Sequence, residues 1–267
     1  MRRAAGAILV GALVGSLLAA CSPDTVRVSF RPSVGTRYRH EVRVHSVTTI
    51  RLAGGPPEET VDDVLLITED TVLPGPPGEV RVQVRLQQAG TPDRTFVARF
   101  DRGAQLAGVE TVEGLPPSVL GPGSLPHILP GAPGAPPDRP LRPGERWTID
   151  TPVGLPGAAP ARISGSGRLL ELGLLDGRKV ASTRAETRVP LTRTAPLRGS
   201  NVTLSGVEIS EGTATRAISD GAVERARTVT RGEFRVTLRP AAREELVAPV
   251  AGTLTIEVRS ETRRLHP

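Results

Sequence analysis

Hydrophobic and polar residues alternate strictly along several stretches of the chain. Across residues 80–86, Val or Leu at every even position alternates with Arg or Gln at the odd positions. Residues 38–52 repeat this pattern over a longer run, with Val42, Val44 and Ile50 on the even side. A period of two places one row of side chains in a core and the other in water, which is typical of an antiparallel sheet. These stretches predict an antiparallel β protein.

Further strands are expected on both sides of a long Pro-rich segment. Asp176-Gly177 and Asp220-Gly221 are typical of tight hairpin turns between such strands. The one stretch that favours a helix is short, at residues 241–246. The predicted strands cover residues 38–52, 61–73, 80–86, 96–100, 106–112, 162–174, 179–191, 202–217, 222–238 and 253–264.

The Pro-rich segment divides the chain. Residues 114–146 contain ten Pro and six Gly, and Pro lacks the amide hydrogen that regular structure needs. We therefore expect a linker without regular elements between a β-rich half at residues 35–113 and a second at 147–267. The predicted fold is mainly β, with antiparallel sheets in two halves, flat or curved into a half-barrel.

Composition and charge exclude some classes of protein. Apolar residues make up 38% of the chain, which is enough for a core and argues against wholesale disorder. The formal net charge is +6, but no basic run is longer than two residues and aromatic residues are 2% of the chain. Nucleic-acid binding needs a basic patch and commonly aromatic platforms, so we expect no nucleic-acid partner.

The N-terminus has the layout of an export signal. Arg2 and Arg3 precede an uncharged stretch, residues 4–20, that is shorter than the roughly 20 residues needed to span a bilayer. The stretch ends in Leu18-Ala19-Ala20-Cys21, and Cys21 is the single cysteine of the chain. Two other interpretations of residues 4–20 stay open: a plain membrane anchor, and a cleaved secretory signal that a cysteine follows by chance.

Leu18-Ala19-Ala20-Cys21 resembles the lipobox of bacterial lipoproteins. The resemblance implies that residues 1–20 are removed and that the Cys21 thiol carries diacylglycerol, with a second acylation at the new amino terminus. Residues 21–34 would then form the lipidated N-terminus and tether, and the formal charge would fall from +6 to +4. Stable anchoring needs two or more such chains. We expect a cell-membrane protein held by lipid on the exported side.

The body also resembles known exported proteins in outline. The Pro-rich run, the step from Gly144 to Trp147 and the flanking β-rich segments are similar to an uncharacterised family of exported β-rich lipoproteins. A looser similarity exists to periplasmic lipoprotein carriers, and it implies a curved sheet over an apolar cavity.

Candidate catalytic residues are few. Of the four histidines, His40 lies on the apolar side of its strand, His45 on the wet side, His127 in the Pro-rich segment and His266 at the penultimate position. A catalytic base needs a nucleophile within reach and a group to orient it. We expect a hydrogen-bonded core residue at His40, disorder around His266, and no catalytic residues.

Metal, cofactor and charge patterns are equally sparse. No two histidines share a ligand spacing, and the neighbouring carboxylates Asp62-Asp63 and Glu244-Glu245 fit solvated charges, so neither metal nor cofactor is expected. Arginines recur on the odd side of two predicted strands. They fit a solvated face paired with Glu41, Glu79 and their neighbours, or a surface for anionic lipid or wall polymers. The positions are Arg37, Arg39, Arg43, Arg51, Arg81 and Arg85.

Together these features predict a lipid-anchored, non-catalytic binding or scaffold module of the cell envelope. Its expected partners are membrane lipid, through the acylated N-terminus, and an envelope protein or apolar ligand. The alternative is a carrier that shelters a lipid or other apolar ligand in a sheet cavity, lined by even positions of residues 38–52 and 80–86. An envelope hydrolase is the third candidate, and it would depend on His40.

Overall fold

The computed structural model describes residues 25–102, 106–112, 135–153, 161–197, 200–240 and 249–266. This part of the chain is built of strands and turns, without helices. The strands are β1 (Val26–Arg27), β2 (Arg37–Leu52), β3 (Glu58–Leu73), β4 (Glu79–Gln88), β5 (Arg94–Asp101), β6 (Leu106–Val112), β7 (Pro140–Leu141), β8 (Arg146–Val153), β9 (Ala161–Leu175), β10 (Arg178–Leu197), β11 (Ser200–Ala217), β12 (Val223–Pro240) and β13 (Val250–Arg264).

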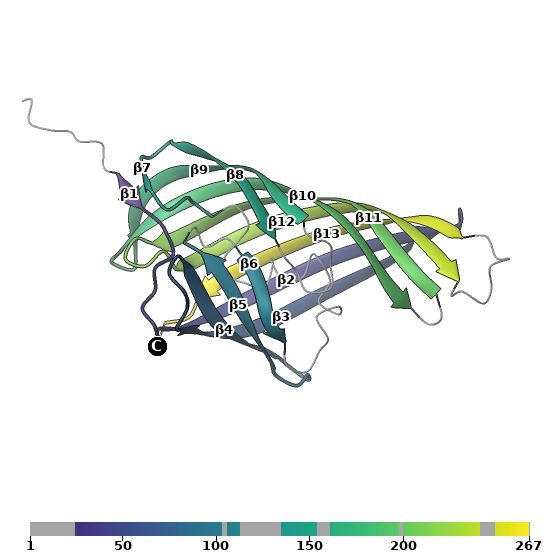
Figure 1. Cartoon of the computed structure of the whole chain (residues 1–267), viewed down its shortest axis with the longest axis horizontal. Coiled ribbons are helices and arrows are strands. Elements are labelled where there is room, and N and C mark those ends of the chain that lie inside the picture. Colours follow the sequence, from purple (N-terminus) through teal and green to yellow (C-terminus); the bar gives the residue numbers. More distant parts are fainter. Residues whose placement is uncertain are drawn as a thin grey trace, which may run out of the picture.

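Eleven of these strands form one antiparallel sheet, in the order β6-β5-β4-β3-β2-β13-β12-β11-β10-β9-β8. The first half of the chain supplies β2 to β6 and the second supplies β8 to β13, and β13 joins them by pairing with β2. The edge strands β6 and β8 approach each other, so the sheet curves into a nearly closed half-barrel (Figure 1). The predicted mainly-β, antiparallel, curved fold is confirmed, and its two halves share a single sheet.

The ten strands predicted from alternation are all present, and β6 has the predicted bounds. The strand β8 was not predicted because Pro152 interrupts its pattern, yet β8 is an edge strand, where Pro is tolerated. Both predicted hairpins also form. Asp176 and Gly177 have φ values of 50° and 77°, as a two-residue hairpin turn requires. The predicted helix at 241–246 lies outside the described residues.

The Pro-rich segment contains a strand, so the expectation of no regular element there is wrong for β7. Pro140 and Leu141 pair with Arg27 and Val26 of β1 in a separate two-stranded sheet. A two-residue strand needs few amide donors, and Leu141 is fully buried. Burial of an apolar side chain therefore fixes this piece of the segment against the body.

Strand register defines two ends of the half-barrel. Arg264 pairs with His40, Arg225 with Arg263, and Val180 with Ala217, so these strand ends lie together. We call this the proximal end; β1 and the C-terminus also lie there in Figure 1. The opposite, distal end carries the β2–β3 hairpin.

Two apolar clusters fill the proximal half. One joins β2 to β5 with Phe30, whose ring meets that of Phe100 edge-on at 6.0 Å between centroids. The other joins β8 to β10 with Val28 and Leu141. In the second cluster the Trp147 indole lies on Gly167, where a Cβ would stand 2.2 Å from the ring. The N-terminal segment thus contributes one side chain to each cluster and is fixed between them.

Candidate functional site

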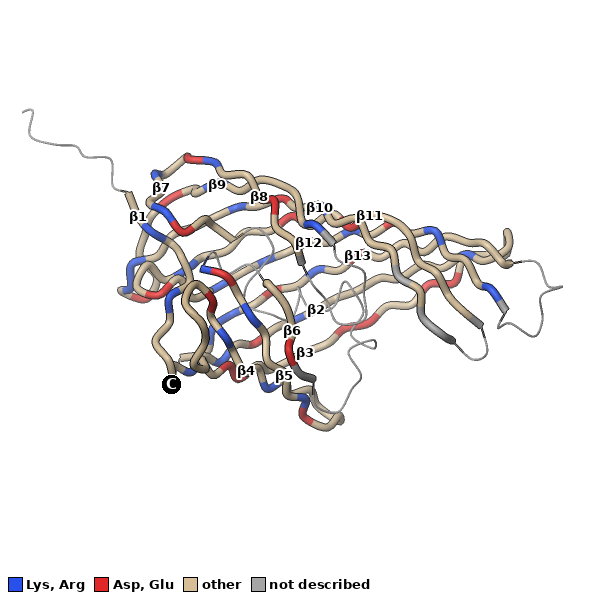
Figure 2. Tube along the Cα trace, viewed as in Figure 1, with Lys and Arg blue, Asp and Glu red and all other residues tan. Residues whose placement is uncertain are grey.

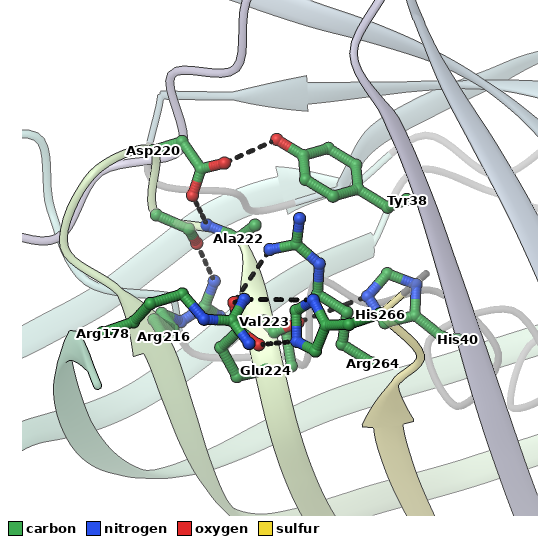
Figure 3. Close-up of polar contacts among 11 residues, drawn as sticks. Tyr38, His40, Arg178, Arg216, Asp220, Ala222, Val223, Glu224, Arg264 and His266 are labelled. Carbon is green, nitrogen blue, oxygen red and sulfur yellow. Dashed lines mark hydrogen bonds and ion pairs between the residues drawn. The ribbon is translucent and has the colours of Figure 1, made fainter. Parts of the chain in front are cut away.

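Charged and polar side chains converge inside the proximal end (Figure 3). We call this group the proximal polar cluster. It brings together the starts of β2, β10 and β12, the ends of β3, β11 and β13, and the β11–β12 turn. Its members are Tyr38, His40, Asp70, Arg178, Arg216, Asp220, Glu224, Arg264 and His266.

Both ring nitrogens of His40 are engaged. Nε2 lies 3.2 Å from the carbonyl oxygen of Val223 and must donate to it, while Nδ1 lies 3.1 Å from Oδ2 of Asp70. A proton therefore lies between Nδ1 and the carboxylate, on one side or the other. His40 is 1% exposed and Asp70 is 2% exposed, so neither faces a substrate. The expectation of a hydrogen-bonded core histidine is confirmed, and the hydrolase hypothesis loses its best candidate.

Glu224 is the centre of an ionic group that holds the C-terminal residues. Its buried carboxylate accepts hydrogen bonds from Arg264 at 2.8 Å and from Nε2 of His266 at 2.9 Å. Arg178 lies 3.5 Å from the same carboxylate and donates to Nδ1 of His266 at 3.0 Å. Both ring nitrogens of His266 are thus held by partners in the cluster. The expectation of disorder at His266 is therefore wrong: a buried anion orders it.

Tyr38 joins this group to the β11–β12 turn. Its hydroxyl donates to Oδ2 of Asp220 at 2.9 Å, and Arg264 lies over its ring at 4.7 Å from the centroid. Burial and the neighbouring Asp220 carboxylate raise the pKa of Tyr38 above its ordinary value. The hydroxyl stays protonated and acts as a fixed hydrogen-bond donor.

Arg216 is the most deeply buried cation of the described chain, at 2% exposure. Burial lowers its pKa to about 10, and one guanidinium nitrogen donates to the carbonyl oxygen of Gly221 at 3.3 Å. Arg216, His40 and Asp70 line a cavity of about 20 Å³, room for a single water molecule. This part of the interior is therefore packed, with little space beside the described side chains.

A third buried acid lies on the inner face of β11. Glu208 is 7% exposed, pairs in register with Val189 and Gly232, and makes no hydrogen bond to any described residue. The Phe234 ring covers Gly232, where a Cβ would stand 2.5 Å from the ring. Burial raises the pKa of Glu208 to about 7. The side chain can therefore change its charge near neutral pH.

The outer face carries a groove of about 690 Å³ that crosses β2, β13, β12, β11, β10 and β9. We call it the outer groove. It runs over two irregularities of register, at Ser182/Thr183 and Thr215/Arg216, and such bulges bend strands and increase their twist. Charged side chains of both signs line it: Glu41, Arg43, Arg225, Arg227, Glu261 and Arg263.

Ion pairs hold much of this lining in place. Glu41 pairs with Arg43 at 3.1 Å and with Arg263 at 3.5 Å, and Arg227 pairs with Glu261 at 2.7 Å. Arg225 makes no ion pair with another described residue. The outer groove thus offers hydrogen-bond donors and acceptors side by side, which suits a polar ligand of mixed charge.

The predicted arginine rows are largely paired with carboxylates. Arg39 and Arg85 approach Glu69, and Arg81 pairs with Glu110 at 2.6 Å. Glu79 pairs with Arg99. The solvated, paired face that the sequence favoured is present on these strands, although Arg37 and Arg51 make no ion pair with another described residue.

Other predicted site residues divide into two groups. His45 is on the wet face as expected, 2.8 Å from the exposed Asp63. The described residues hold no cluster of His, Cys, Asp or Glu that could bind a metal ion. The lipobox residues Leu18, Ala19, Ala20 and Cys21, together with His127 and Glu244-Glu245, lie outside the described residues.

The comparisons with known proteins add no family. No protein-family model matches the chain, and no curated protein matches it. Within the described part of the chain, no helix has the length and hydrophobicity to cross a membrane.

Proposed function

We propose that this protein is an exported lipoprotein, anchored in the cell membrane by acyl chains on Cys21, whose body is a non-catalytic binding module of the envelope. The lipobox-like Leu18-Ala19-Ala20-Cys21 and the basic, then uncharged, N-terminus support the anchor. The first described residues support it too, because β1 fixes the chain to the body shortly after Cys21.

One observation supports a binding module over a carrier. Val80, Val82, Val84 and Leu86, the even positions that a carrier would use to line its cavity, are buried in a packed core beside only about 20 Å³ of space. The outer groove, of about 690 Å³, is by contrast lined by charged and polar side chains. A partner with an extended, polar, mixed-charge segment, such as an envelope protein, fits this groove.

The anchor is tested by Cys21→Ser. We expect an unprocessed precursor that carries no lipid label, whereas the parent chain yields a mature form with the mass of its acyl groups. Unchanged processing and mass would contradict the anchor.

The groove is tested by photo-crosslinking in intact cells. A crosslinking residue at Thr213, exposed in the outer groove, should give a discrete adduct. The matched control is Thr253, exposed on β13 toward the distal end. Equal adducts at both positions, or none at Thr213, would contradict a partner in the groove.

The carrier stays a second candidate because of the distal inner face. From Val44 onward the inward positions of β2, and Leu254, Ile256 and Val258 of β13, are half-buried instead of buried. Such a surface can hold an apolar chain. Organic extraction of the native mature protein distinguishes the two: a stoichiometric lipid beyond the acyl anchor supports the carrier, and its absence supports the binding module.

A further inference from the structure

The point where the chain joins the body decides which end faces the membrane. Four residues lie between Cys21 and Val26, the first residue of β1, and a fully extended chain covers at most about 18 Å from one to the other. Val28 and Phe30 follow directly and are buried in the two proximal clusters. An acyl anchor on Cys21 would therefore hold the proximal end close to the lipid surface.

The proximal end also carries the two most exposed large apolar side chains of the described chain. Leu174, the penultimate residue of β9, is 72% exposed, and Val34, just before β2, is 64% exposed. Gly35 donates its amide to the carbonyl of Val72, and Leu174 pairs with Lys179 next to the β9–β10 turn. Both side chains therefore lie at or beside turns at the same end of the sheet.

Cations and anions occur along the whole half-barrel (Figure 2), but the proximal segments and the distal β2–β3 hairpin differ in net charge. The proximal segments 25–37, 74–78, 101–102, 138–142, 176–179 and 218–222 hold eight Arg or Lys and four Asp. The distal hairpin, residues 51–63, holds one Arg and four Asp or Glu. An anionic surface would attract the first set and repel the second.

Three of the proximal cations are exposed and available to a partner. Arg37 and Lys179 make no ion pair with another described residue. Arg142 lies near Glu145, whose carboxylate Arg139 already binds. Each such cation contributes about a fivefold gain in occupancy at an anionic surface.

We propose that the proximal end is a membrane-contact surface, with Val34 and Leu174 in the headgroup region and Arg37, Arg142 and Lys179 against lipid phosphates. The proposal rests on the acyl anchor of the proposed function, and it adds the orientation of the half-barrel relative to the bilayer. The long strands then project away from the bilayer, and the distal hairpin with its carboxylates is the part farthest from it.

The test uses the mature acylated protein in vesicles of phosphatidylcholine with phosphatidylglycerol. Because acylation blocks the only native thiol, Val34→Cys and Leu174→Cys each accept a single fluorophore; Val61→Cys, 52% exposed on the distal part of β3, is the control. We expect brominated lipid to quench the labels at 34 and 174 and to leave the label at 61 unquenched. Equal quenching at all three positions would overturn the proposal.

The charge contribution has its own control. One control uses vesicles of phosphatidylcholine alone, and the other uses the triple variant Arg37→Gln, Arg142→Gln and Lys179→Gln. In both, the quenching at 34 and 174 should fall, because the three cations together raise the occupancy of the anionic surface about a hundredfold. Unchanged quenching would remove the electrostatic part of the proposal. Trp147 fluorescence confirms that each variant is folded.

Failure of the anchor has a different signature. Protein that does not float with the vesicles, and whose Cys21 reacts with the fluorophore, would overturn the anchor and the orientation together. Protein that floats with Cys21 blocked, but shows equal quenching at the three positions, would overturn the orientation alone.

Discussion

Glu208 predicts a pH-dependent loss of stability that one substitution should abolish. The side chain is buried on the inner face of β11, and burial raises its pKa from 4.5 to about 7. The folded protein therefore holds this proton more tightly than the unfolded chain does. As the pH rises from 4.5 to about 7, the unfolded chain ionises first and the free energy of unfolding falls; above about 7 the loss is complete.

The size of the effect follows from the shift. At 1.36 kcal/mol for each pKa unit, the loss is about 3 kcal/mol. Glu208→Gln keeps the shape of the side chain and removes its titration. Replacing the carboxyl adds a constant to the difference in free energy of unfolding between variant and parent. On top of that constant, the difference should shift by about 3 kcal/mol in favour of the variant between about pH 4 and about pH 8.

Urea unfolding followed by Trp147 fluorescence measures this difference at each pH. Trp147 is the only tryptophan and is buried, so it reports the loss of the core. Glu211→Gln is the matched control, because Glu211 is exposed on the opposite face of the same strand and pairs with Arg184 at 3.6 Å. The control should change by about 0.5 kcal/mol or less. A Glu208→Gln difference that does not vary with pH would refute the reasoning.

Three further substitutions test the packing and the polar cluster. Gly167→Ala drives a Cβ into Trp147 and should cost about 1–3 kcal/mol with a shift in Trp fluorescence, whereas Gly173→Ala on the same strand, with open space around it, should be neutral or slightly stabilising. Glu224→Gln should cost about 2 kcal/mol and speed hydrogen exchange of the last residues, measured by mass spectrometry; unchanged exchange would contradict the role of Glu224 in holding the C-terminal residues. His40→Leu leaves its buried carboxylate partner, Asp70, unpaired and should lower the free energy of unfolding in urea by about 3–5 kcal/mol. A loss of about 0.5 kcal/mol or less, as is usual for an exposed residue, would contradict the importance of this pairing.

The sequence predicts the strands well where one face is plainly apolar. In β4 the even positions from 80 to 86 are all Val or Leu, and they are the buried ones. In β11 the signal is weaker, because Glu208 and Arg216 stand on the inner face while Val207 and Ile209 stand on the outer one. Alternation there gives a strand without telling which face is buried.

The buried charges were missed for a related reason. Asp70 follows Leu66 and Thr68 on the buried face of β3, and an acid in such a row marks a buried polar site. Its partner His40 lies on another strand, and the pairing depends on register, which period-two patterns leave undetermined. The Glu224 group depends on three separate strands, so only the folded sheet brings it together. Cys21 stays a prediction from the sequence.

The pairing of β13 with β2 gives a truncation an unusual effect. The last strand of the chain stands in the middle of the sheet, so a nascent chain released before residue 250 would lack a central strand instead of an edge. Both β2 and β12 would then present unpaired amides and carbonyls, which template aggregation. Closure must also wait for partners about two hundred residues apart in sequence to meet, and such long-range pairing is intrinsically slow. We expect this protein to complete its sheet only after residues 250–264 have been synthesised, and to depend on protection of β2 and β12 until then.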